Sequence, residues 1–288
     1  MKWAYCTNGF ADHRLPEALE VLADLGYAGA AITLDHGHLD PYSPGLAAEV
    51  SRTAGLLERL GLDAVVETGG RYTLDPLRKH HPTLISDDPG PRVEFLTTAM
   101  RVAADLGAPV VHLWSGVRPD GMPESEAYTR LARQCARLLD EADQVGVTLG
   151  FEPEPGMFVA GLDGFERLRA MLGAHARFGL TLDIGHCHCV EPDDLVTCVR
   201  RALPYTVHVQ IEDMCRGVHE HLEFGEGEID FPPVLAALHG YSGLVAVELA
   251  RHSHAAPQVA RRSIDFLRRA HEGAGTGVAG TGRPAGRG

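Results

Sequence analysis

Short apolar runs alternate with longer amphipathic segments along the sequence, and this alternation constrains the fold more than any other feature. The expected strands are Trp3–Cys6, Ala28–Leu34, Asp63–Glu67, Val110–Trp114, Thr148–Glu152, Gly179–Asp183, Thr206–Ile211 and Leu244–Glu248. The expected helices lie near 14–25, 45–60, 90–106, 124–145, 162–172, 192–203, 231–239 and 256–270. Such alternation is typical of parallel strands joined by helices. Eight repeats favour an α/β fold with a single closed (β/α)8 TIM barrel, with a doubly wound open sheet as the alternative.

The junctions between these segments support the same architecture. Gly107 and Gly146 each follow a helical pattern and precede a strand, as glycines that end helices do. We expect the barrel to occupy residues 1–271 as one catalytic domain, since this fold typically needs about 250 residues. The remaining segment, 272–288, is rich in glycine and lacks apolar periodicity, so it is predicted to be disordered.

Charge and hydropathy restrict the class of partner. The net charge of −13 repels nucleic-acid phosphates, so no nucleic-acid partner is expected. No run approaches the roughly 18 apolar residues of a membrane span, and the amino-terminal segment lacks the features of a secretory signal. The sequence therefore predicts a cytoplasmic protein without a membrane partner. It is expected to act on a small sugar-like molecule and is compatible with a homo-oligomer.

Acidic residues close several of the predicted strands. Glu152, Asp183 and Glu248 end the fifth, sixth and eighth strands, and Glu67 ends the third. In a (β/α)8 barrel these strand ends meet at one mouth, where active sites form. Four carboxylates brought together would repel one another unless a cation neutralised them. This predicts a site for Mn²⁺, Mg²⁺, Co²⁺ or Zn²⁺, although Glu67 taken alone is equally typical of a solvated loop acid.

Histidines and a glutamine accompany these acids. His208 and Gln210 are two residues apart on the seventh strand and therefore share its polar face. Gln210 is predicted to be a ligand or a substrate contact, whereas His208, one layer deeper, is assigned a structural, hydrogen-bonded role. His112 lies near the end of the fourth strand. Gly185 permits a sharp turn after the sixth strand, which would direct His186 into the mouth.

Further candidates lie outside the strands. His219 and His221 share a face if the chain there is extended, and they could be metal ligands, proton shuttles, anion binders or simply a solvated pair. The segment 68–91 is long for a loop, which indicates a lid. Arg71 and Lys79 within it could attract a phosphate or carboxylate of the substrate. The other predicted substrate contacts are Trp114, His186 and Arg216.

Five short motifs occur in a specific order along the chain. They are Gly150-Phe151-Glu152, Leu182-Asp183-Ile184-Gly185-His186, Val207-His208-Val209-Gln210-Ile211-Glu212-Asp213, Gly225-Glu226-Gly227-Glu228-Ile229-Asp230 and Val247-Glu248. In this order they resemble the xylose-isomerase-like TIM-barrel superfamily of sugar and sugar-phosphate isomerases and epimerases. Its hydroxypyruvate-isomerase-like and endonuclease-IV-like members are included in the resemblance, which covers nearly the whole chain.

The resemblance implies a set of site residues. The four metal positions would be Glu152, Asp183, Gln210 and Glu248, with Glu152 and Glu248 also acting as the acid/base pair. Many members have His at the position of Gln210, but the hydroxypyruvate-isomerase-like members resemble this chain in having Gln there, with a His two residues earlier. Positions similar to the additional zinc ligands of endonuclease IV are held by His112, His186, His219 and His221. One to three ions are therefore expected, although Glu67 departs from the His of that enzyme.

The leading hypothesis is isomerisation or epimerisation of a sugar, sugar phosphate or cyclitol-like hydroxy-ketone. The metal would chelate a carbonyl and an adjacent hydroxyl and stabilise the enediolate formed when Glu152 or Glu248 removes a carbon-bound proton. One alternative is a multinuclear metal-dependent hydrolase or phosphodiesterase. A keto-cyclitol dehydratase and a non-catalytic sugar-binding protein on the same barrel are further alternatives.

Overall fold

Eight parallel strands close into a barrel in the computed structural model, which describes residues 1–276 and the side chains of residues 1–273. The strands are β1 (Lys2–Cys6), β2 (Gly29–Thr33), β3 (Asp63–Glu67), β4 (Val110–Trp114), β5 (Thr148–Glu152), β6 (Phe178–Asp183), β7 (Thr206–Ile211) and β10 (Leu244–Val247). Around the barrel they follow the order β1-β10-β7-β6-β5-β4-β3-β2, and neighbouring strands are parallel. The predicted (β/α)8 barrel is confirmed, and the open-sheet alternative is wrong.

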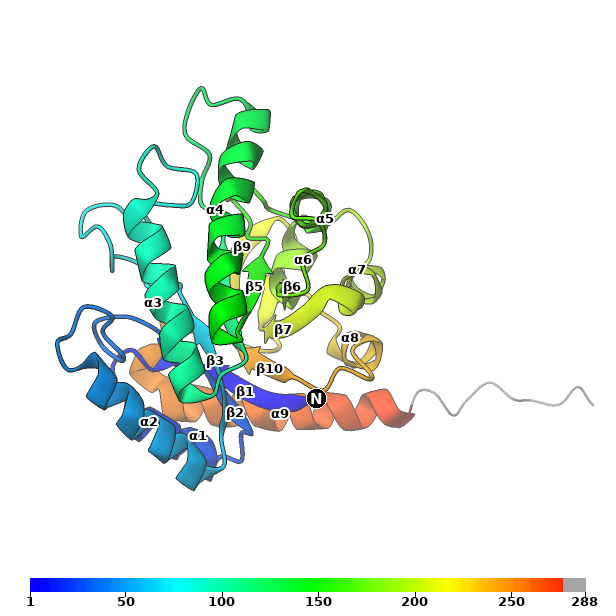
Figure 1. Ribbon diagram of the computed structural model, residues 1–288. Helices are drawn as coiled ribbons and strands as arrows, with labels where there is room; N and C mark the ends of the chain where they lie inside the picture. Colours follow the sequence, from blue (N-terminus) through cyan, green and yellow to red (C-terminus); the bar gives the residue numbers. More distant parts are fainter. Residues whose placement is uncertain (277–288) are drawn as a thin grey trace, which may run out of the picture.

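Helices surround the barrel on its outer side (Figure 1). They are α1 (Leu15–Asp24), α2 (Leu46–Leu60), α3 (Gly90–Leu106), α4 (Glu124–Val145), α5 (Leu162–Met171), α6 (Ile184–Val190), α7 (Leu195–Ala202), α8 (Phe231–Ala237) and α9 (Ala256–Thr276), with 3₁₀ turns η1 (Thr7–Phe10), η2 (Leu203–Tyr205) and η3 (Ala250–Ala255). Gly107 and Gly146 follow α3 and α4 with φ of 72° and 79°, as expected of glycines that end helices. Within residues 1–276, no helix has the length and apolar character needed to cross a membrane.

The last helix runs past the expected end of the barrel domain. Ala260, Ile264 and Leu267 are buried on one face of α9, which anchors this helix to the rest of the molecule. From this anchored part the helix continues through Thr276, because each added residue gains a backbone hydrogen bond once a helix is nucleated. The remainder of the segment that we predict to be disordered, 277–288, lies outside the described residues.

Small side chains fill the barrel below its mouth. Ala4, Ala31 and Ala246 pack together there in a buried apolar cluster. At Gly150 a Cβ atom would lie 2.6 Å from Thr181 Oγ1, so a larger residue does not fit. The alternate residues of the strands face the helices and form the main core. The polar residues that end the strands therefore lie above a narrow, apolar interior.

A β-hairpin that our sequence analysis does not predict follows β7. Its strands are β8 (Asp213–Cys215) and β9 (Val218–Leu222), which pair antiparallel. The buried Asp213 carboxylate accepts hydrogen bonds from the backbone N–H groups of Met214, Gly225 and Ile229, at 2.9, 2.8 and 3.1 Å. One carboxylate thus fixes both ends of the hairpin and the glycine-rich loop after it.

Candidate active site

Four consecutive strands of the barrel carry the four ligands implied by the family resemblance. Glu152 ends β5, Asp183 ends β6, Gln210 lies near the end of β7, and Glu248 follows β10. These strands adjoin one another in the order β5, β6, β7, β10. Asp183 and Gln210 are paired in register, and Gln210 Nε2 lies 2.8 Å from Glu248 Oε2. The structure therefore brings this set together at one part of the mouth.

Several oxygen atoms of this set are buried without a hydrogen-bond partner among the described residues. They are Glu152 Oε1, Asp183 Oδ2 and Gln210 Oε1. A buried polar atom without a partner is costly, and coordination of a divalent cation by these oxygens would remove that cost. Carboxylate and amide oxygens are donors that such a cation accepts. The residues present therefore fit the divalent metal that the sequence predicts.

His112 contacts Glu152 directly. Its Nε2 atom lies 2.5 Å from Glu152 Oε2, and both side chains are buried. Burial alone lowers the pKa of His112, but the neighbouring Glu152 charge outweighs burial and raises that pKa to about 9. Burial raises the pKa of Glu152, but His112 outweighs it and holds that pKa below its usual range. His112, which the sequence predicts to be a metal ligand, thus contacts the side chain of Glu152, another predicted ligand.

His186 reaches the same acids from the start of α6. Its backbone N–H donates to Asp183 Oδ1 at 2.7 Å, so Asp183 caps this short helix. Its Nδ1 lies 3.2 Å from Glu152 Oε1 and 3.8 Å from Asp183 Oδ1. Burial lowers the pKa of His186, but the charges of Asp183 and Glu152 together raise it to about 10. The structure places His186 at the mouth, as the sequence predicts.

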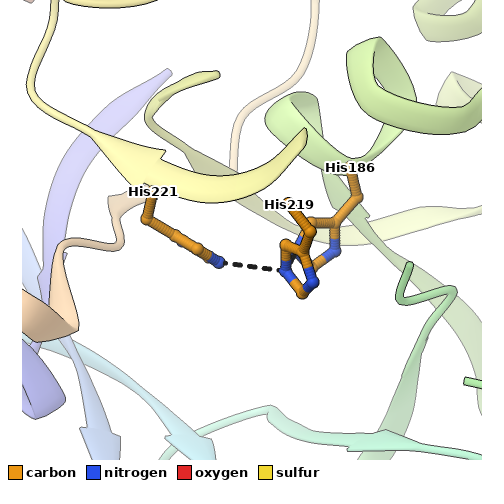
Figure 2. A group of neighbouring side chains, drawn as sticks. All are labelled: His186, His219 and His221. Atoms are coloured by element: carbon orange, nitrogen blue, oxygen red, sulfur yellow. Dashed lines mark hydrogen bonds between the residues drawn. The ribbon is translucent and has the colours of Figure 1, made fainter. Parts of the chain in front are cut away.

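Three imidazole rings converge beside these acids (Figure 2). His219 and His221 extend from β9 towards His186 on α6, so the hairpin supplies two of the three rings. His219 Nε2 lies 3.0 Å from His186 Nε2 and 3.4 Å from His221 Nε2. Burial and the neighbouring His186 lower the pKa of His219 to about 4. The His219 ring therefore favours the neutral form, in which an imidazole nitrogen can bind a cation.

Glu212 is a site residue that our sequence analysis does not identify. It is fully buried, and neither of its carboxylate oxygens has a hydrogen-bond partner among the described residues. Oε2 lies 3.8 Å from His221 Nδ1. Burial and the neighbouring Asp183 charge raise the pKa of Glu212 well above its usual range. Two-residue periodicity from Gln210 could have identified it, had the polar face been followed past the end of the strand.

Glu67, left open between a site acid and a solvated acid, is buried. It accepts hydrogen bonds from Gln210 Nε2 at 3.1 Å, Cys6 Sγ at 3.3 Å and Thr33 Oγ1 at 3.4 Å. His208 is also buried, with Nε2 3.6 Å from Glu67 Oε1. Neither ring nitrogen of His208 has a hydrogen-bond partner in the described part of the chain, in contrast to the hydrogen-bonded role expected for it. Glu67 therefore belongs to the mouth rather than to a solvated loop.

The segment 68–91 covers Trp114 at the end of β4. The His80 ring lies 4.9 Å from the Trp114 ring, and the Arg92 guanidinium carbon lies 4.6 Å from it. Trp114 is only 4% exposed as a result. The loop thus packs on Trp114, so the residue that the sequence proposes as a substrate contact serves in this structure as the surface that holds the loop.

The three predicted basic contacts lie in different surroundings. Arg71 and Lys79 are exposed on the segment 68–91, and burial together with the Lys79 and Arg92 charges lowers the pKa of His80 to about 4. Arg216 instead donates to the carbonyl oxygens of His188 at 3.2 Å and Glu191 at 2.6 Å. These carbonyls lie at the end of α6, where a cation is favoured. Arg216 therefore ties the hairpin to α6.

The chain is similar in sequence to known proteins over much of its length. A family model described as xylose isomerase-like TIM barrel matches residues 19–270. L-ribulose-5-phosphate 3-epimerase UlaE of Shigella flexneri is 26% identical over 204 residues, which cover 67% of this chain and 70% of that protein. An uncharacterized protein of Methanocaldococcus jannaschii is 28% identical over 163 residues. This second match covers 54% of the chain and spans only 56% of the archaeal protein.

Solved structures share the fold over nearly the whole chain. A D-tagatose 3-epimerase-like protein superposes with a TM-score of 0.78 at 22% identity, covering 97% of this chain and 100% of that one. The zinc-bound IOLI protein superposes with a TM-score of 0.76 at 18% identity, covering 93% and 99%. Likeness at these identities establishes a common barrel, and the chemistry has to be argued from the side chains.

Proposed function

We propose that this chain, which belongs to the xylose isomerase-like TIM barrel family, is a divalent-metal-dependent isomerase or epimerase of a sugar, sugar phosphate or cyclitol-like hydroxy-ketone. The observation that carries the proposal is the set of oxygen donors at the ends of four adjacent strands, of which those on Glu152, Asp183 and Gln210 are buried without a hydrogen-bond partner among the described residues. The ligands would be Glu152, Asp183, Gln210 and Glu248. This donor set lies at the end of the barrel where active sites of this fold form.

Glu152 and Glu248 are suited to move a proton between the two faces of a substrate carbon. They lie on β5 and after β10, with β6 and β7 between them, so they approach the mouth from different sides. Each carboxylate is held by a nitrogen, Glu152 by His112 Nε2 and Glu248 by Asn8 Nδ2 at 2.8 Å. One carboxylate would take the carbon-bound proton, and the other would return a proton to the opposite face or the neighbouring carbon. When bound, a divalent cation acidifies that carbon by polarising the adjacent carbonyl.

The relatives support ketoses as the substrates to examine first. The named curated relative is an L-ribulose-5-phosphate 3-epimerase, and one structural neighbour is a D-tagatose 3-epimerase-like protein. A 3-epimerase inverts a carbon next to a ketone, which matches the arrangement of two acids around a cation site. We therefore propose epimerisation at C3 of a ketose or ketose phosphate as the reaction.

Deuterium incorporation tests this proposal. Ketoses and ketose phosphates are incubated with the protein and Mn²⁺ in D₂O, and exchange at C3 is followed by NMR. We expect exchange with at least one compound, and a loss of about 10²-fold or more in Glu152→Gln and Glu248→Gln. Glu141→Gln, on the outer helix α4 where Glu141 pairs with Arg101, is the matched control and should exchange normally. Absence of deuterium in every compound, with Mn²⁺ bound, would refute the proposal.

A second candidate function is favoured by the three imidazoles. In a tetrahedral zinc site with Zn–N distances of about 2.0–2.1 Å, ligand nitrogens are separated by about 3.3–3.4 Å. The Nε2 separations of 3.0 and 3.4 Å among His186, His219 and His221 are close to this value. A further ion there would suit a multinuclear hydrolase or phosphodiesterase. Metal analysis separates the two functions, because one ion per chain supports the epimerase and two or three ions support the hydrolase.

A further inference from the structure

The amide group of Gln210 is held in a single orientation by acidic neighbours. Its Nε2 atom donates to Glu67 Oε1 at 3.1 Å and to Glu248 Oε2 at 2.8 Å. An ionised carboxylate can only accept hydrogen bonds, so the NH₂ group faces these two acids when both are ionised. The amide oxygen is thereby turned to the other side, where it is buried and has no hydrogen-bond partner among the described residues.

Glu67 is itself fixed in the position that this contact requires. Thr33 and Glu67 are paired in register across β2 and β3, and Thr33 Oγ1 donates to Glu67 Oε2. Cys6 on β1 donates to Glu67 Oε1 from the other side. With the Gln210 bond, Glu67 is the acceptor of three hydrogen bonds while being only 2% exposed. Its carboxylate is therefore not free to turn away from Gln210.

We infer that Glu67 is a positioning residue that fixes Gln210 with its oxygen toward the cation, which gives an all-oxygen set of four protein ligands. The inference rests on the proposed cation site at Glu152, Asp183, Gln210 and Glu248. A set of carboxylate and amide oxygens suits Mn²⁺ and Mg²⁺, whereas an imidazole in it would favour Zn²⁺. Glu67 is not a ligand, but it keeps the Gln210 oxygen in the position that this preference requires.

Two variants separate orientation from charge. Glu67→Gln makes the neighbour of Gln210 an amide, which can donate as well as accept and allows the Gln210 amide to turn its NH₂ group toward the cation. Glu67→Asp keeps the negative charge but shortens the side chain by one methylene, so it withdraws the acceptor. Outer partners of metal ligands typically contribute about 10- to 100-fold in affinity. We expect both variants to lose that factor in Mn²⁺ affinity, whereas a purely electrostatic role would spare Glu67→Asp.

The assay titrates metal-free protein with Mn²⁺ alone and measures free Mn²⁺ by electron paramagnetic resonance. In a Gln210→Leu background there is no amide to orient, so Glu67→Gln should have no further effect. Gln210→His, which exchanges an oxygen donor for a nitrogen, should lower the ratio of Mn²⁺ to Zn²⁺ affinity by about tenfold or more. Glu141→Gln serves again as the matched control and should bind as the unaltered chain does.

Three results would overturn the inference. These are a change below threefold in both Glu67 variants, an undiminished effect of Glu67→Gln in the Gln210→Leu background, and an unaltered ion preference in Gln210→His. Circular dichroism of the metal-free variants tests whether they fold. If Glu67→Gln does not fold, the Mn²⁺ affinity of Glu67→Asp alone decides between the outcomes. These metal titrations contain no substrate, so their results do not depend on whether the protein is an epimerase. Failure of the inference about Glu67 can therefore be distinguished from failure of the epimerase proposal.

Discussion

Replacing Arg92 by Met should release the segment 68–91 from the barrel while leaving the barrel folded. The Arg92 guanidinium is buried, donating from Nε to Pro82 O at 3.0 Å and from Nη2 to His80 O at 3.2 Å. It also lies over the Trp114 ring. Methionine retains an apolar side chain of similar length but donates no hydrogen bond. The two hydrogen bonds that are lost join α3 to the segment, whereas the ring contact joins α3 to β4.

The magnitude follows from these contacts. A hydrogen bond that involves a charged group contributes about 1.5–3 kcal/mol. At the lower end of this range, the two bonds to the segment together contribute about 3 kcal/mol. Since 1.4 kcal/mol corresponds to a factor of ten, the opening equilibrium of the segment should rise by about 10²-fold.

Amide hydrogen exchange measures this change residue by residue. In Arg92→Met, amides of 78–85 should exchange about 10²-fold faster at neutral pH, while those of β4 and β5 should be nearly unchanged. Arg101→Met is the control, because Arg101 lies on the same helix but pairs with Glu141 at the surface. It should alter exchange of the segment by less than tenfold. Unchanged protection of 78–85 in Arg92→Met, with α3 destabilised instead, would show that Arg92 supports the helix and not the segment.

Three further predictions concern the mouth. Gly185→Ala should lower the free energy of unfolding, measured by urea denaturation, by about 1–3 kcal/mol, because the added Cβ would lie 2.0 Å from Glu212 Oε1. Adding Glu212→Ala should restore most of this loss. The pKa of His80 is lowered to about 4 from 6.5 by burial and nearby cations, so the protonated form is disfavoured when the segment is packed. Its contribution to stability should be complete above pH 6.5 and lost as the pH falls through 4, and His80→Leu should flatten the pH profile of segment exchange over that range. Mn²⁺ at 100 times its Kd should raise the free energy of unfolding, measured by thermal denaturation, by about 2.7 kcal/mol. A chelator should reverse this increase, and Asp183→Asn should show a much smaller one.

The strands could be predicted from the sequence because they are buried on both faces. Runs such as Val110–Leu113 are nearly all apolar, and no helix or surface strand needs such a run. The β8–β9 hairpin could not be recognised in the same way. Val218–Leu222 is mostly polar and exposed to half-buried, so it has no apolar face that would distinguish a strand from a loop.

The acids of the mouth could be predicted, but their individual partners could not. Glu152 and Asp183 were recognised because they end strands, and strand ends converge in this fold whatever the side-chain details. Glu67 was left open because its burial depends on donors from β1, β2 and β7, far apart in the sequence. Arg216 illustrates the same limit, since the helix end that accepts its hydrogen bonds is set only by the packing of the hairpin on α6.

The role of Asp213 has a consequence for how the chain can be altered. Because one carboxylate binds the backbone of Met214, Gly225 and Ile229, the segment between Met214 and Gly225 leaves the barrel and rejoins it at a single point. The hairpin strands are not part of the barrel sheet, so changes of length or sequence within that segment should leave the closure of the eight strands intact. His219 and His221, which this segment brings to the mouth, could therefore be replaced together by exchanging the whole segment. Such an exchange would place a different set of metal-binding groups on the same barrel.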